Sequence, residues 1–192
     1  MEQLASLRAV PNLVLLRPAD ANETVEAWRV ALRHADGPVG LVLSRQKLPV
    51  LDRSELAPAS GVARGAYVLA QAGEGPPELI LIATGSEVAL ALEAHRRLAA
   101  GGVRSRVVSM PSWELFAAQP RAYRDEVLPP EVTARVAIEA GSPLGWERFA
   151  GPRGAILAVD RFGASAPEAV VMREYGFTPE RVVEAARRVL AG

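Results

Sequence analysis

Residues 79–98 read LILIATGSEVALALEAHRRL, an apolar run, a small turn and an amphipathic pattern in direct succession. A short continuous apolar run is typical of a strand that is buried on both faces. The pattern after the turn has helical spacing and predicts a helix over 86–100. Its inward residues are expected to be Val88, Ala91, Leu92 and Leu98. The stretch therefore predicts a strand, a tight turn and a helix, the repeating unit of an α/β fold.

The same alternation extends along the whole chain. Apolar runs predict strands over 13–16, 39–43, 66–71, 79–83, 104–110, 134–139 and 155–159. Helical patterns cover 2–9, 20–35, 86–100 and, irregularly, 113–128, and a last helix begins at Thr178-Pro179. Apolar strands between amphipathic helices predict a mostly parallel sheet flanked by helices, which is an α/β fold.

Two helices have clear start signals and apolar faces. Asp20 and Glu23 have the spacing of a capping box, and Gly37-Pro38 would end the same helix. One face of that helix holds Val25, Trp28, Leu32 and Ala35. The buried face of the last helix is expected to hold Val182, Val183, Ala186, Val189 and Leu190.

The alternation breaks in the proline-containing stretch 46–64, which we interpret as a connection between domains. We expect residues 1–50 to be the end of one α/β domain, 51–64 a linker and 65–192 a complete smaller α/β domain. The first part supplies only two strands, and two parallel strands do not close a core. Either the chain is a fragment, or another polypeptide completes that sheet.

Composition excludes several classes of function. The 22 basic and 22 acidic residues of the 192 cancel, so no net field favours nucleic acid or an anionic membrane. The chain has no cysteine, which excludes disulfides, thiolate catalysis and cysteine-ligated metals. Its apolar runs are far shorter than the roughly 18 residues of a membrane span. We see no signal peptide, and the composition fits a cytoplasmic protein.

The turn ATGSE, residues 83–87, is a weak candidate for a phosphate site. Free N–H groups at a helix start attract anions, but this turn has one glycine and no lysine. Thr84 and Glu87 have capping-box spacing, Ser86 is an alternative cap, and Glu87 would repel a phosphate. We therefore expect capping rather than phosphate binding.

Other conspicuous residues are interpreted as structural. His34 and His95 have no partners at metal-binding or triad spacing. Segments 139–147 and 160–168 follow strands and are rich in small residues, which suits tight turns and domain contacts. No basic stripe accompanies the aromatic residues, so we expect core or interface roles for them. They are Trp113, Trp146, Phe149, Phe162, Tyr175 and Phe177.

Two segments at the ends of neighbouring strands are stronger candidates. RPADANE, residues 17–23, and LSRQK, residues 43–47, lie where open α/β sheets bind ligands. Asp20 either caps its helix or accepts hydrogen bonds from a substrate hydroxyl. Arg45 either forms an interdomain salt bridge or binds a phosphate through its planar fork.

The motifs and their order resemble the C-terminal third of transketolase, from Glu2 to the last helix. They are RPADANE, LSRQ, IATGSEVALALEA, RVVSMPS, VLPPEVTARVAIEAG, DRFGASAP and EYGFTPE. Each is weak alone, but seven in this order are specific. The pyruvate dehydrogenase beta subunit and deoxyxylulose-phosphate synthase share the architecture, while LSRQ and FGASAP look more like transketolase.

The resemblance implies an activity and its requirements. Transketolases transfer a two-carbon ketol unit between sugar phosphates in the pentose phosphate pathway. They use thiamine diphosphate with magnesium or calcium, and their active sites lie between the subunits of a homodimer. The aspartate of the family's RPxD segment, which supports stereochemical choice at the sugar, corresponds to Asp20. The arginine of its SRQ segment, which binds the sugar phosphate, corresponds to Arg45.

Other parts of the family's machinery do not occur in these 192 residues. The HQPxE segment, the glutamate that activates the cofactor and the GDG-type metal motif are missing. We therefore expect neither ketol transfer nor tight thiamine diphosphate binding by this chain alone, and no metal site in it. The alternatives are a non-catalytic dimerisation or small-ligand-binding module, or the same part of another thiamine-diphosphate enzyme.

Overall fold

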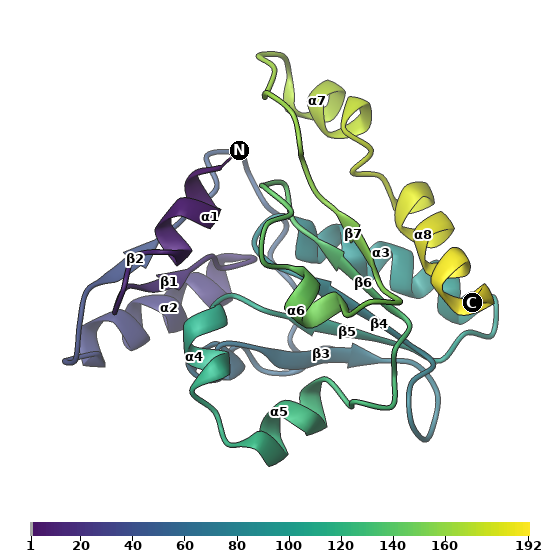
Figure 1. The fold of residues 1–192 in the computed structure, drawn as a ribbon, viewed down its shortest axis with the longest axis horizontal. Coiled ribbons are helices and arrows are strands. Elements are labelled where there is room, and N and C mark those ends of the chain that lie inside the picture. The colour runs from purple at the N-terminus through teal and green to yellow at the C-terminus, as the bar shows by residue number, and fades with distance from the viewer. Residues whose placement is uncertain (1) are drawn as a thin grey trace.

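The strands form two separate sheets in the computed structural model, which describes residues 2–192 (Figure 1). In the small sheet, β1 (Val14–Leu16) pairs in parallel with β2 (Val39–Leu41). The large sheet has the order β3-β5-β4-β6-β7. Its strands are β3 (Tyr67–Gln71), β4 (Leu79–Ala83), β5 (Ser105–Ser109), β6 (Arg135–Ile138) and β7 (Ala155–Leu157). Only β3 is antiparallel to its neighbour, which confirms the mostly parallel α/β fold.

Helices connect the strands much as the periodicity predicts. The helices are α1 (Gln3–Arg8), α2 (Ala21–Arg33), α3 (Glu87–Ala100), α4 (Trp113–Ala117), α5 (Arg121–Val127), α6 (Glu147–Ala150), α7 (Glu168–Glu174) and α8 (Pro179–Ala191). The irregular stretch 113–128 is two short helices, and the sequence patterns did not predict α6 and α7. A 3₁₀ helix, η1 (Ala59–Arg64), lies inside the predicted linker and packs on α2. No helix among residues 2–192 combines the length and apolar character needed to cross a bilayer.

The central strand β4 is buried on both faces, as its continuous apolar sequence predicts. Leu79 and Leu81 pack with residues of α3 and α8 on one face of the large sheet. Ile80 and Ile82 face the other side, among aromatic residues of α4 and α6. Thr178 caps α8 by accepting a hydrogen bond from the backbone N–H of Arg181.

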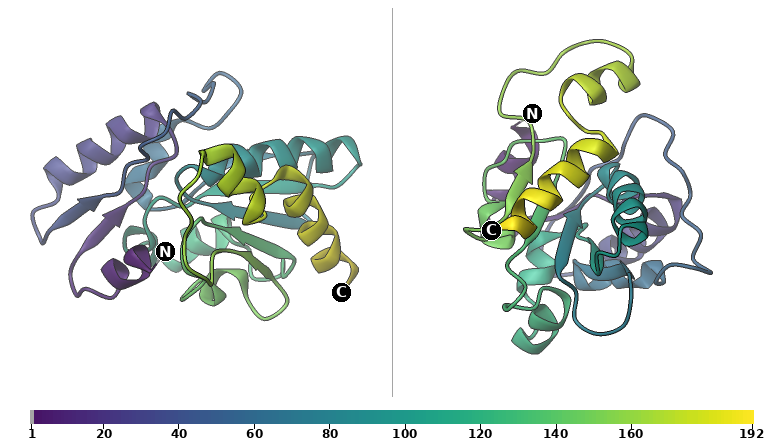
Figure 2. Two further views of the ribbon diagram at one scale, coloured as in Figure 1. Left: turned by 90° about the horizontal axis from the view of Figure 1, so that it is seen from above. Right: turned by 90° about the vertical axis from the view of Figure 1, so that its right-hand side faces the viewer.

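The small sheet is far less enclosed. Its helix α2 buries Glu23 and Ala27, while Val25, Trp28 and Leu32 are 52%, 51% and 82% exposed. The apolar face of this helix is therefore turned away from the core. Figure 2 shows α2 along the outer side of the small sheet, and η1 packs against it.

Candidate functional site

Two polar loops meet at one edge of the small sheet. Because β1 and β2 are parallel and in register from Val14↔Val39 to Leu16↔Leu41, their carboxyl ends lie side by side. The backbone N–H of Val42 donates to the carbonyl of Leu16 and holds the two strand ends together. The loop that carries Asp20 and the loop that carries Arg45 consequently leave the same edge.

A pocket of about 270 Å³ opens at this edge. Its polar lining comes from Asp20 at the start of α2, from Thr24 in the first turn of α2 and from Ser44 and Gln46 on the other loop. Pro18, Leu43 and Leu48 supply apolar walls. Two hydroxyls and an amide around a small cavity suit a ligand that carries several hydroxyl groups.

Asp20 is both the cap of α2 and part of this pocket. Its Oδ1 accepts from the backbone N–H of Glu23 at 2.9 Å and from Nη2 of Arg53 at 3.1 Å. Its Oδ2 accepts from the backbone N–H of Leu51 at 2.9 Å. The side chain of Asp20 is buried. The capping prediction is confirmed, and the carboxylate is fixed in one orientation.

Arg45 differs from Asp20 in being exposed. Its neighbours Ser44 and Gln46 line the pocket, and Arg45 itself does not. The structure therefore brings the two loops together but leaves the Arg45 guanidinium outside the pocket wall. An exposed arginine beside a polar pocket is free to contact an anionic group at its rim.

The turn ATGSE has a structural role that differs from the predicted one. No side chain caps α3. Instead, Nη1 of Arg17 donates at 2.6 Å to both the carbonyl of Thr84 and Oε2 of Glu87. Ser86 donates to Glu87 at 2.6 Å, so the predicted caps serve a buried ion pair. The capping prediction is wrong because Glu87 turns inward to neutralise a buried arginine.

Gly85 allows Arg17 to approach this turn closely. A Cβ on Gly85 would lie 2.6 Å from Cζ of Arg17, and the residue has a φ of +58°. The backbone N–H of Gly85 donates to the carbonyl of Arg17. The start of α3 is therefore occupied by Arg17 from the same chain.

Glu139 extends this charged cluster. Its two carboxylate oxygens accept hydrogen bonds from Nη1 and Nη2 of Arg8, each at 2.7 Å. Its Oε2 also accepts a hydrogen bond from the indole N–H of Trp146 at 2.8 Å. Oε1 of Glu139 also lies 4.0 Å from Arg17. Burial by itself would lower the pKa of the Arg17 guanidinium. The negative charges of Glu87 and Glu139 have the larger combined effect, and the pKa of Arg17 is raised. The cluster joins the small-sheet region to the large sheet.

A second buried contact between the two regions centres on Glu23. Its carboxylate accepts from Ser109 at 2.6 Å, from Tyr67 at 2.7 Å and from the backbone N–H of Ala19 at 2.8 Å. Burial raises the pKa of Glu23, although these hydrogen bonds work against the shift. The reciprocal bond expected of the capping box exists, but it goes to Ala19 rather than to Asp20.

The histidines have the structural roles that the sequence suggested. Nδ1 of His95 lies 2.8 Å from the hydroxyl of Ser105, and burial, with the nearby charge of Arg96, lowers the pKa of His95. His34 ends α2. Trp113, Trp146 and Phe149 form edge-to-face pairs inside the core, the first two with centroids 4.9 Å apart.

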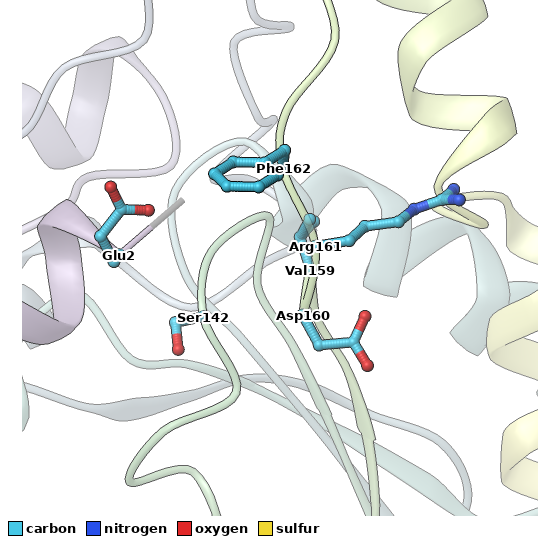
Figure 3. A pocket seen from close by; sticks show the side chains of 6 residues that line it. All are labelled: Glu2, Ser142, Val159, Asp160, Arg161 and Phe162. Carbon is cyan, nitrogen blue, oxygen red and sulfur yellow. The ribbon is translucent and has the colours of Figure 1, made fainter.

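Among the aromatic residues expected in the core or at an interface, Phe162 is fully accessible, at 96% exposure. It borders a pocket of about 330 Å³ with Glu2, Ser142 and the neighbouring Val159–Arg161. Figure 3 shows the side chains of Asp160 and Arg161 directed away from Glu2, so the charged groups do not converge. Arg161 instead donates to the carbonyl of Glu174 at 3.1 Å. This pocket offers no arrangement for chemistry.

Sequence reasoning missed four functional or structural residues. Arg17, Arg53, Glu139 and Tyr67 were not singled out. Hydrophobic periodicity does not reveal their hydrogen bonds and ion pairs, because the main partners lie far away along the chain. The one available hint was an arginine and a glutamate directly after apolar strands, at positions 17 and 139, where the chain remains close to the core.

Family profiles match two segments of the chain. A profile described as the transketolase-like TK C-terminal domain matches residues 65–178. A second, described as the transketolase pyrimidine binding domain, matches residues 1–50.

Individual relatives agree with these matches. The chain is 57% identical to the transketolase of Geobacillus stearothermophilus over 190 residues, which is 99% of this chain and 28% of that enzyme. The transketolase structure from Leishmania mexicana aligns with a TM-score of 0.90 at 42% identity, over 99% of this chain and 27% of that one. The Pichia stipitis transketolase solved with sedoheptulose-7-phosphate aligns with a TM-score of 0.89 at 36% identity, over 100% of this chain and 27% of that one.

Proposed function

The chain belongs to the transketolase family, and from that premise we propose that it acts as the C-terminal part of a transketolase. In that enzyme a two-carbon ketol unit passes from a ketose phosphate to an aldose phosphate. We assign residues 1–50 to the end of the pyrimidine-binding domain, 51–64 to a linker and 65–192 to the C-terminal domain. The chain spans about 28% of the length of its curated relatives, so the activity belongs to a larger assembly.

The observation that supports this function best is the shared edge of β1 and β2, where the loops of Asp20 and Arg45 flank one polar pocket. We propose that Asp20 accepts hydrogen bonds from sugar hydroxyls next to the carbon that is transferred. Arg45 binds the phosphate with charge-assisted hydrogen bonds from the rim. A sugar phosphate carries both of the groups that this edge would recognise, and holding it there contributes to catalysis by positioning.

Thiamine diphosphate, with magnesium or calcium, would supply the electron sink in the complete enzyme. Within residues 2–192 no group of three or more His, Cys, Asp or Glu side chains is placed to hold a metal ion. The turn that resembles an anion site is filled by Arg17. We propose that this chain contributes sugar phosphate binding to the complete enzyme.

The test is a reconstituted enzyme in which this chain replaces the matching 28% of the Geobacillus stearothermophilus transketolase. We expect ketol transfer by the reconstituted enzyme and none by the isolated chain. Arg45→Ala is expected to raise the KM for a phosphorylated acceptor by about tenfold or more, the order of one charged hydrogen bond, and to change the KM for an unphosphorylated acceptor little.

Arg33→Ala is the matched control, because Arg33 is also an exposed arginine of the small-sheet region and does not line the pocket. It should leave both KM values unchanged. Equal increases for phosphorylated and unphosphorylated acceptors in Arg45→Ala would contradict the phosphate role. Ketol transfer by the isolated chain would contradict its assignment as one part of the enzyme.

A second candidate function is a non-catalytic contact module, since α2 exposes Val25, Trp28 and Leu32 on one helix. Large exposed apolar patches are typical of protein interfaces, and a homodimer is the partner that the family implies. A contact module would change its mass on dilution in sedimentation experiments. Its association would be independent of added sugar phosphate.

A further inference from the structure

A second polar pocket lies between α5 and α6, apart from the edge of the small sheet. It has a volume of about 380 Å³ and opens beside Arg135, the first residue of β6. We propose that this pocket binds a small phosphate monoester whose organic part is apolar. Its lining residues all fall within 124–152, so no residue of the proposed sugar phosphate site takes part.

Arg135 is the fixed cation of this pocket, because its side chain donates four hydrogen bonds to backbone carbonyls. Its Nε donates to the carbonyl of Val132 at 2.8 Å, and its Nη1 donates to the carbonyl of Phe149 at 2.9 Å. Its Nη2 donates to the carbonyls of Leu128 at 3.2 Å and Pro129 at 2.7 Å. A guanidinium has five N–H donors. One N–H, on Nη1, therefore remains for a ligand.

These contacts do not neutralise the charge of Arg135. Backbone carbonyls satisfy its N–H groups but carry no net charge, and Arg135 forms no ion pair with a carboxylate of residues 2–192. Burial lowers the pKa of Arg135, and the charge of Glu131 only partly opposes that shift. A half-buried cation without a counter-ion is unfavourable. An anion in the adjoining pocket would therefore stabilise this side chain.

Two further arginines make the lining of the pocket positive. Arg124 on α5 and Arg148 on α6 are exposed, and neither forms an ion pair with a carboxylate of residues 2–192. Arg148 lies beside the ring of Trp113, with its Cζ 5.1 Å from the ring centroid. The one acidic residue of the lining, Asp125, already accepts a hydrogen bond from Nε of Arg121 at 3.2 Å. Three guanidiniums thus face one paired carboxylate.

The charge, walls and size of the pocket indicate which anion it binds. A phosphate monoester carries a charge of about −1.5 to −2 near pH 7 and three acceptor oxygens, which suits a lining of three guanidiniums. A carboxylate has a single charge and two oxygens and suits it less well. Leu128 and Phe149 add apolar walls. The volume falls in the range of about 300–1,000 Å³ that is typical of small-molecule sites, so the phosphate group has room for an organic part.

Isothermal titration calorimetry of the 192-residue chain with phenyl phosphate tests the proposal, at low ionic strength in a buffer without phosphate. Phenyl phosphate has the phosphate group and an apolar ring, but it lacks the hydroxyl groups that the small-sheet pocket would recognise. We expect one saturable site. Arg124→Gln and Arg148→Gln should each weaken binding about tenfold, the order of one hydrogen bond to a charged group. Inorganic phosphate, which has no apolar part, and benzoate, which has a carboxylate, should both bind more weakly.

Arg187→Gln is the matched control, since Arg187 is an exposed arginine of α8 that lies outside this pocket and forms no ion pair with a carboxylate of residues 2–192. It removes the same charge and should leave the affinity unchanged. Because Arg124 and Arg148 are also exposed and without ion pairs, their variants should keep the melting temperature of the unmodified chain.

Several results would overturn the inference. They are the absence of saturable binding, an unchanged affinity in both Arg124→Gln and Arg148→Gln, and an equal loss in Arg187→Gln. Binding that is lost in Arg45→Gln but kept in the two lining variants would also overturn it, because the ligand would then lie at the small-sheet edge. Equal affinity for benzoate or for inorganic phosphate would overturn the assignment to a phosphate monoester. The titration does not depend on ketol transfer, so its failure leaves the proposed function intact.

Discussion

The two sheets are built from the same kind of unit but are enclosed to very different degrees. In the large sheet, β4 is buried on both faces by helices and aromatic side chains. In the small sheet, only two strands pair, and α2 exposes Trp28 and Leu32. Two parallel strands do not close a core alone. Val14, Leu16 and Ala27 of this region belong to the same buried apolar cluster as Leu81 of the large sheet, and buried polar contacts add to that attachment.

Polar contacts between the regions have a functional consequence. The charged cluster around Arg17 and Glu87 fixes the loop that leads to Asp20. The contact of Arg53 fixes the carboxylate of Asp20. The contact of Glu23 with Tyr67 fixes the start of α2. The pocket thus lies on the less enclosed region, while the groups that orient it are anchored in the more enclosed one.

The largest expected effect comes from breaking the charged cluster. Glu87→Ala leaves the Arg17 guanidinium buried with its nearest carboxylate removed, and such a loss costs about 3–5 kcal/mol of the free energy of unfolding. Glu93→Ala, on the same helix, removes an exposed pair with Arg97 and should cost less than about 0.5 kcal/mol. Urea unfolding measures both. Equal costs would mean that the cluster does not join the regions.

A pair of identical truncations compares the enclosure of the two regions directly. Leu81→Ala, in fully buried β4, is expected to cost about 2–5 kcal/mol. Leu32→Ala, in α2 at 82% exposure, should change the free energy of unfolding by no more than about 0.5 kcal/mol. A large cost for Leu32→Ala would show that a partner covers α2 in solution, and sedimentation at several concentrations would then identify a second copy.

A smaller effect tests the close approach of Arg17 to the ATGSE turn. Gly85→Ala combines a positive φ with a Cβ only 2.6 Å from the guanidinium, whereas Gly75→Ala has a positive φ and no heavy atom within 4 Å. The φ contribution is about 1–2 kcal/mol for each. Gly85→Ala should be the more destabilising of the two in thermal unfolding. Equal melting temperatures would show that Arg17 moves aside without loss.

The smallest expected effect is a change in how the free energy of unfolding depends on pH. Burial raises the folded-state pKa of Glu23 above its ordinary value of 4.5. Below pH 4.5 both states hold the proton; above it the unfolded state releases the proton first, so stability falls as pH rises toward the raised pKa. Urea unfolding at a series of pH values should show this decline in the unmodified chain and a weaker decline in Glu23→Gln. Parallel curves would contradict a raised pKa of Glu23.

Much of the fold could be predicted from the sequence because it depends on local patterns. The apolar run 79–83 became a strand buried on both faces, and Asp20 and Thr178 cap helices as their spacing indicates. The short helices α6 and α7 could not be predicted, since four and seven residues are too few to show a period. The meeting of the loops of Asp20 and Arg45 followed from parallel strands, whereas the exposure of Arg45 did not.

The sequence by itself determined the α/β class, the succession of the strands and of the longer helices along the chain, and the family to which the chain belongs. Only the tertiary structure decided which charged residues would be buried and with what partners. Arg17 and Glu87 are 70 positions apart, and Arg8 and Glu139 are 131 apart. Periodicity describes a residue's own helix or strand, but a buried charge is stable only with a partner in reach. That proximity is a property of the folded chain.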